Sequence, residues 1–345
     1  MALHMLKLLL GALLLFGPQV AGVSQARPSV LVTGVSQARP SQQVTSVLQV
    51  FDTRSGEIRT VREFPYRIEA PNWTVDGRYL VYNSNWAMWR ISPEGGEPEM
   101  IPTGEVRCNN DHVLSADGRL LAVSGFSPGA TGSRVFILPL EGGEPWLVTP
   151  NAPSYLHGWS PDGKTLCYCA QRGGNFDIYT IPASGAALAS GTVPGVVPAS
   201  GTVPGAAPGE EELRLTTAEG LDDGPEYSPD GRYIWFNSVR TGLMQVWRMK
   251  ADGSDQRQMT FDTDLNSWFP HVSPDGKKVV FLSYHVGDLR PDQHLADKNV
   301  CLRMMTSKGK KLHIIIELFG GQGTINVNSW SPDSRYIAFV SYRLD

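Results

Sequence analysis

The chain has 345 residues, of which 41% are hydrophobic, and is therefore long enough to bury a large core. Its formal net charge of −4 at pH 7 provides no basic field, which excludes nucleic acid as the expected partner. The 36 glycines and 25 prolines favour a soluble β domain with many turns.

An apolar segment stands near the N-terminus. Lys7 precedes the run Leu8–Phe16, which is too short for a comfortable membrane span and is typical of a secretory signal peptide. We therefore expect residues 1–26 to be a cleaved signal peptide, and the mature protein to be periplasmic or secreted and not membrane-spanning. The alternative is a frayed apolar terminus. Residues 27–45, which contain part of a duplicated segment, are expected to form a flexible linker.

A short signature recurs six times, at intervals of 41, 45, 68, 45 and 58 residues. Each copy follows an apolar residue and precedes a basic-then-apolar run, which indicates a strand, a tight turn and a second strand. A period of about 40 to 50 residues, with about four strands in each unit, is typical of β-propeller blades. The copies are Thr74-Val75-Asp76-Gly77, Ser115-Ala116-Asp117-Gly118, Ser160-Pro161-Asp162-Gly163, Ser228-Pro229-Asp230-Gly231, Ser273-Pro274-Asp275-Gly276 and Ser331-Pro332-Asp333-Ser334.

A second repeated strand pair follows the signatures, and one copy of it stands at the other end of the chain. Val47–Glu57 precedes the first signature, and we expect it to complete the sheet begun by Ser329–Tyr342. This pairing closes the ring and hides both open edges. The sequence therefore predicts an all-β fold, a six-bladed β-propeller with four-stranded blades over residues 46–345. Residues 183–210, a low-complexity stretch with its own duplication, are predicted to be a loop inserted in the third blade.

The repeats resemble those of the TolB-like six-bladed propellers, which carry WD40-like Ser-Pro-Asp-Gly repeats. The first, second and last copies depart from the pattern at Thr74-Val75, Ala116 and Ser334, which we interpret as tolerated turn variants. The sequence shows no counterpart of the small α/β domain that precedes the propeller in TolB. The resemblance implies an architecture and a binding role, and it is nearly silent about chemistry.

The segments that enter the six inner strands are polar, and in a propeller they line the central channel and its entrance. Under strict alternation the residues facing the channel are Asn72, Val113, Gly158, Glu226, His271 and Ser329, with the other histidines one step further out unless a bulge shifts the register. Convergent His, Glu and Asn side chains can hold a polar ligand or a divalent metal. The candidate ligand-binding residues are Asn72, His112, His157, Glu226, Trp268, His271 and Asn328, of which His112, His157, Glu226 and His271 are the candidate metal ligands.

Four other features are interpreted structurally. The adjacent acids Asp222 and Asp223 are expected to be solvated, and the charged excursion 285–297 to be a loop on the same face as the channel entrance. The four cysteines are expected to be buried free thiols. The Gly-x-Ser-x-Gly match at 125–129 fails as a nucleophile because Pro128 lacks the backbone N–H that an oxyanion hole needs.

Two functions remain open. The first is an exported, non-enzymatic and monomeric propeller that binds a protein or a cell-envelope polymer through its loop face and central channel, without a cofactor. The second is a metal-dependent polysaccharide lyase or hydrolase. The positions of His157 and His271 ahead of their signatures are loosely similar to those in oligogalacturonate lyase, whose propeller binds a divalent metal.

Overall fold

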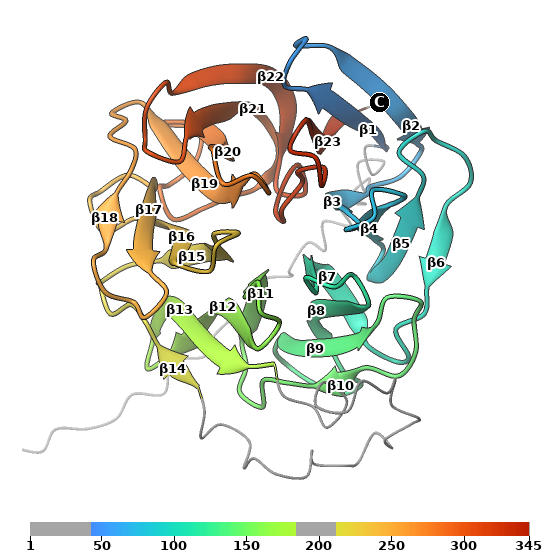
Figure 1. Cartoon of the computed structure of the whole chain (residues 1–345), viewed down its shortest axis with the longest axis horizontal. Helices are drawn as coiled ribbons and strands as arrows, with labels where there is room; N and C mark the ends of the chain where they lie inside the picture. Colours follow the sequence, from blue (N-terminus) through green and yellow to red (C-terminus); the bar gives the residue numbers. More distant parts are fainter. Residues whose placement is uncertain (1–42, 184–211, 345) are drawn as a thin grey trace, which may run out of the picture. The chain divides into compact units, whose positions relative to one another are not determined.

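The computed structural model of the chain describes residues 43–183 and 212–344. The predicted signal peptide (1–26), the linker as far as residue 42 and the inserted loop from residue 184 lie outside the described residues. No helix in these two described ranges is long and apolar enough to cross a membrane. The strands there form six antiparallel sheets arranged as the blades of a ring, which confirms the predicted all-β propeller (Figure 1).

Five blades have four labelled strands each, ordered from the inner to the outer strand as in the sequence. Blade 1 is β3 (Glu69–Trp73), β4 (Leu80–Ser84), β5 (Ala87–Ile91) and β6 (Glu99–Ile101); blade 2 is β7 (Arg107–Leu114), β8 (Leu120–Phe126), β9 (Arg134–Pro139) and β10 (Trp146–Leu147); blade 3 is β11 (Ser154–Trp159), β12 (Thr165–Arg172), β13 (Asn175–Pro182) and β14 (Leu213–Arg214). Blade 4 is β15 (Asp222–Tyr227), β16 (Tyr233–Ser238), β17 (Gln245–Lys250) and β18 (Arg257–Gln258); blade 5 is β19 (Leu265–Val272), β20 (Lys278–His285), β21 (Ala296–Thr306) and β22 (His313–Gly321).

Blade 6 is shared between the two ends of the described chain. It contains β2 (Ile58–Phe64), β1 (Val44–Asp52) and β23 (Tyr336–Leu344), and β1 pairs with β23 along its whole length (Figure 1). The predicted closure is therefore confirmed, and β1 starts at Val44, inside the predicted linker. The innermost strand of this blade is reduced to one bridge between Trp330 and Ile337.

The signatures form turns with the same hydrogen bonds in all six blades. The hydroxyl at the first position donates to the aspartate two residues later, at 2.7 Å in Thr74–Asp76 and 2.6 Å in Ser160–Asp162. The fourth position has positive φ, which glycine adopts without strain, and Ser334 adopts it with φ of 59°. The departures from the pattern are therefore tolerated turn variants, as predicted.

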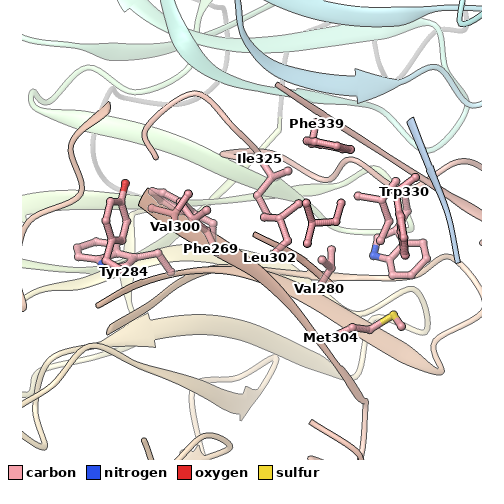
Figure 2. Packing of buried hydrophobic residues seen from close by; sticks show 14 of the residues in the cluster. Phe269, Val280, Tyr284, Val300, Leu302, Met304, Ile325, Trp330 and Phe339 are labelled. Atoms are coloured by element: carbon pink, nitrogen blue, oxygen red, sulfur yellow. The ribbon is translucent and has the colours of Figure 1, made fainter. Parts of the chain in front are cut away.

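The core lies between the blades. One cluster joins blade 5 to blade 6, where Phe269, Leu302 and Ile325 are buried together with Trp330 and Phe339 (Figure 2). Truncating a large side chain in such a core costs about 2–5 kcal/mol of unfolding free energy. The packing makes each blade depend on its neighbours, so the ring is a rigid frame for its loops.

The ring has two faces with different connections. The face that carries the signature turns is called the signature face. The opposite face, called the loop face, carries the second-to-third-strand connections and the links from one blade to the next, and the inner strands start there. The charged excursion 285–297 connects β20 to β21 and is on the loop face, as expected.

Candidate functional site

In blades 1 to 5 the pairing of the inner strand with the second strand shifts register just before the signature. At three of the shifts a residue with positive φ precedes a proline: Ala70 (57°), Gly224 (62°) and Phe269 (54°). Proline has no N–H to continue the ladder, and a bulge places two residues opposite one, so strict alternation fails here. The shifts lie between Glu69 and Asn72, Cys108 and His112, Leu156 and Gly158, Asp223 and Glu226, and Trp268 and His271.

Glu226 joins blade 4 to blades 5 and 6. Its Oε2 lies 2.6 Å from Nδ1 of His271, and its Oε1 accepts hydrogen bonds from the Val272 N–H at 2.8 Å and from Asn328 Nδ2 at 2.7 Å. The other ring nitrogen of His271 lies 2.5 Å from the carbonyl oxygen of Ile325. Both ring nitrogens and both carboxylate oxygens are therefore engaged. Glu226, His271 and Asn328 are called the interblade tie below.

Asn72 extends this network across the seam between blades 6 and 1. Its Nδ2 donates to the carbonyl oxygen of Asn328 at 2.5 Å, and Ser329 Oγ donates to the carbonyl oxygen of Pro71 at 2.8 Å. Four of the candidate residues, Asn72, Glu226, His271 and Asn328, are thus brought together by the fold.

A second group of polar side chains lies at the loop-face end of the inner strands. Nε2 of His157 is 3.3 Å from Oδ1 of Asp223, and Nε2 of His294 is 3.8 Å from the other oxygen of the same carboxylate. His294 belongs to the β20–β21 loop, and its Nδ1 also contacts the side-chain oxygen of Gln322. The carboxyl of Asp111 interacts electrostatically with both His157 and Asp223. Asp111, His157, Asp223 and His294 are called the mouth cluster.

Aromatic rings support the mouth cluster. His157 stacks on Phe269 with centroids 5.7 Å apart, and the ring of His294 lies 4.5 Å from that of Trp268. Trp268, predicted as a ligand-binding residue, has no exposed surface and packs beneath His294.

Burial and charge set the protonation states of the mouth cluster. Burial acts to lower the pKa of His157, but the carboxylates of Asp223 and Asp111 outweigh it and raise this pKa to about 9. Burial acts to raise the pKa of Asp223, but His157 and His294 lower it overall. Burial raises the pKa of Asp111 to about 6 and lowers that of His294. At neutral pH, His157 and Asp223 therefore form a closed ion pair, and neither is a free base.

Glu69 lies beside this cluster at the start of β3. Burial raises its pKa to about 7, with Asp111 and Asp297 adding to the effect and Arg67 opposing it. Arg67 forms an ion pair with Asp297 at 2.8 Å.

His112 lies apart from both groups. It is fully buried, its Nδ1 is 3.2 Å from the carbonyl oxygen of Asn110, and burial lowers its pKa to about 4. It is therefore a neutral core histidine. Within residues 43–183 and 212–344, no three His, Cys, Asp or Glu side chains form a group that could hold a metal ion. The four candidate metal ligands are thus divided among the interblade tie, the mouth cluster and the core, and their binding of a ligand stays a prediction.

Sequence reasoning missed Asp111, Asp223 and His294. The expectation that Asp222 and Asp223 are solvated is wrong, because they are 1% and 7% exposed and pair with Arg240 and His157. For Asp223 the signal that could have revealed this is the Gly224-Pro225 step directly after it, which marks the bulge. All four cysteines are buried and free, as predicted.

The loop face also gathers exposed aromatic side chains. Within the described ranges, three aromatic residues are exposed: Tyr66 (47%), Trp86 (45%) and Phe261 (75%). They lie in the β2–β3, β4–β5 and β18–β19 connections, all on the loop face. Exposed aromatic side chains that share one face favour a role of that face in binding.

Comparisons with known proteins identify the class. The family described as the TolB beta propeller domain matches residues 206–311. An uncharacterized protein of Agrobacterium fabrum is 43% identical over 297 residues, covering 86% of this chain and 92% of that protein.

Solved structures agree with this result. One from Agrobacterium tumefaciens, described as a TolB candidate, has 42% identity and a TM-score of 0.76, and covers 89% of this chain and all of that one. TolB from Acinetobacter baumannii has 18% identity and a TM-score of 0.59, over 82% of this chain and 65% of that one, which shows a shared fold. This chain belongs to the TolB-like β-propeller family.

Proposed function

We propose that the protein is an exported, non-enzymatic propeller that binds a protein or a cell-envelope polymer through its loop face and the entrance of its central channel. The observation that carries this proposal is the position of Tyr66, Trp86 and Phe261, the three exposed aromatic side chains of the described residues, on one face of a rigid ring. Such groups supply much of the binding energy at protein interfaces.

The polar groups near the axis agree with a binding role. The ring nitrogens of His271 and the carboxylate oxygens of Glu226 are buried and face each other or neighbouring protein groups, and Asp223 raises the pKa of His157 against the effect of burial. General acid–base catalysis needs a group that can reach the substrate in the correct protonation state. These side chains instead connect neighbouring blades and hold the loop-face entrance in shape.

The metal-dependent lyase or hydrolase finds less support. It requires His112, His157, Glu226 and His271 to converge, and they lie in three separate environments. The direct check is cleavage of polygalacturonate by the purified protein with added Mn²⁺. Turnover that is lost in His157→Ala and His271→Ala, with the fold intact, would replace the binding proposal with this alternative.

The binding proposal is tested by photo-cross-linking in cells that produce the protein. A photoreactive residue is placed at Tyr66 or Phe261 on the loop face, and at Met100 or Leu213 on outer strands as controls. The controls are 57% and 58% exposed, so they match the test sites in accessibility. Adducts confined to the loop-face positions are expected. Adducts at the outer strands alone, or none at either set, would contradict the proposal.

Export is tested separately by fractionating the cells and sequencing the N-terminus of the mature protein. The signal-peptide pattern of residues 1–26 supports export, and a mature chain that starts near residue 27 outside the cytoplasm is expected. A cytoplasmic protein that retains Met1 would contradict it.

A further inference from the structure

The turn of the β4–β5 hairpin in blade 1 has a bulky residue at a position where glycine is preferred. It has a two-residue turn, Asn85-Trp86, in which Ser84 pairs with Ala87 and both central residues have positive φ, 50° and 66°. Such a turn favours Asn-Gly, because only glycine adopts positive φ freely at the second position. A tryptophan there is strained, and 45% of it is exposed.

The corresponding hairpin of blade 3 has glycine at this position. Its turn between Arg172 and Asn175 is Gly173-Gly174, with φ of 61° and 93°. The two hairpins connect the same strands of their blades, so the architecture does not require a bulky residue at this place. A residue that costs stability and exposes a large ring is expected where binding needs it.

An arginine is held against Trp86. The guanidinium of Arg107, at the start of β7, lies 4.6 Å from the centre of the Trp86 ring, and Phe126 packs edge-on against the same ring at 5.9 Å. Arg107 is exposed, and Phe126 is its cross-strand partner. Stacking orders the guanidinium in advance, so less entropy is lost when it pairs with an anion. Trp86, Arg107 and Phe126 are called the Trp86 patch.

The Trp86 patch carries uncompensated positive charge. Arg107 has no ion-pair partner in the part of the chain that the structure describes, and Glu105, two residues earlier, does not pair with it. Arg134 pairs in the sheet with Gly125, the neighbour of Phe126, and its Nε is buried without a hydrogen bond. Other arginines near the loop face are each paired: Arg67 with Asp297, Arg172 with Glu212, Arg240 with Asp222 and Arg290 with Asp292.

We infer that the Trp86 patch is the anchor for a protein partner, and that it takes an acidic segment whose carboxylate pairs with Arg107 while an apolar group packs on Trp86. Tryptophan and arginine are enriched at the centres of protein interfaces, where lysine is depleted, which favours a polypeptide over a glycan. Arginine also binds carboxylates through two parallel hydrogen bonds. This inference rests on the proposed function and names the chemistry of its partner.

The test starts from random 12-residue peptides displayed on phage and selected on the wild-type propeller. Selected peptides are expected to be rich in Asp and Glu, and to bind at least about tenfold more weakly to Trp86→Gly and to Arg107→Ala. Arg290→Ala and Met100→Ala are matched controls, because they remove an exposed but paired arginine and an exposed apolar side chain on an outer strand. Both are expected to bind within about twofold of the wild type.

Trp86→Gly carries a second readout. Because Asn-Gly suits the turn better than Asn-Trp, its melting temperature is expected to equal or exceed that of the wild type. A melting temperature lower by more than about 3 °C would show that Trp86 is retained for packing, and would overturn the inference.

Three other results would overturn it. They are a failure to enrich acidic peptides, peptides whose affinity is unchanged in both variants, and polygalacturonate that binds at Trp86 and displaces the peptides, which would make the patch a glycan site. Peptides that bind through Phe261 would leave the proposed loop-face function standing and remove only this inference. Failure of loop-face cross-linking in cells would remove the proposed function itself.

Discussion

Replacing Glu226 with alanine tests whether the interblade tie holds the ring together. Its carboxylate accepts hydrogen bonds at 2.8 and 2.7 Å from the Val272 N–H and from Asn328, and it lies 2.6 Å from Nδ1 of His271; the side chain is almost wholly buried. Hydrogen bonds to charged groups contribute about 1.5–3 kcal/mol each, and buried donors left unpaired add to the loss. Because neighbouring bonds are not additive, we expect a total loss of about 4 kcal/mol.

This loss converts to a shift in melting temperature. An unfolding entropy of about 2.1 cal/mol/K per residue gives about 0.6 kcal/mol/K for a domain of about 300 residues, so the midpoint should fall by about 6 °C. Scanning calorimetry of the wild type and Glu226→Ala measures it. Glu226→Gln should lose about half as much, because one acceptor oxygen remains. Glu141→Ala, which removes an exposed partner of Arg90, should change stability by less than about 1 kcal/mol. A Glu226→Ala midpoint within 1 °C of the wild type would refute the reasoning.

Three further predictions concern backbone, charge and thiols. Gly224→Ala should lower the melting temperature by several degrees, because residue 224 has a φ of 62° and the added Cβ would lie 2.6 Å from a side-chain oxygen. In the control Gly163→Ala no atom lies within 4 Å of the added Cβ, so its melting temperature should fall less. Equal decreases in the two variants would contradict the steric argument. Burial raises the pKa of Glu69 from 4.5 to about 7, so the folded state keeps a proton that the unfolded chain has released, and stability falls as pH rises through this window. The melting temperature of Glu69→Gln should therefore equal that of the wild type near pH 4.5 and exceed it at pH 8. A difference in melting temperature that is the same at both pH values would contradict this prediction. Burial raises the pKa of the Cys167 and Cys169 thiols, so iodoacetamide followed by mass spectrometry should label neither until the protein unfolds.

The fold could be predicted because its signal is local and repeated. Each signature specifies a turn through one hydroxyl, one aspartate and one residue with positive φ, and these act within a few residues of the chain. The closure by β1 and β23 followed from a strand pair without a partner at each end. Neither step required knowledge of contacts between distant residues.

The site was predicted only in part. Alternation grouped Glu226 with His271, and the structure shows their side chains in contact; that they bind a ligand stays a prediction. It could not place Asp223, because the bulge before Glu226 interrupts the period of two. His294 reaches the mouth cluster from a loop whose path depends on tertiary contacts with Trp268 and Gln322. Trp86 gave no signal because the sequence alone does not show that its turn needs positive φ.

Amide hydrogen exchange tests the central claim most directly. The mature propeller is measured alone and after mixing with cell-envelope extract, and protection is compared between the two faces of the ring. The account predicts slower exchange in the loop-face connections, including residues 65–68, 85–86 and 259–264, with the signature turns unchanged. Slower exchange confined to the signature turns or the outer strands would contradict it.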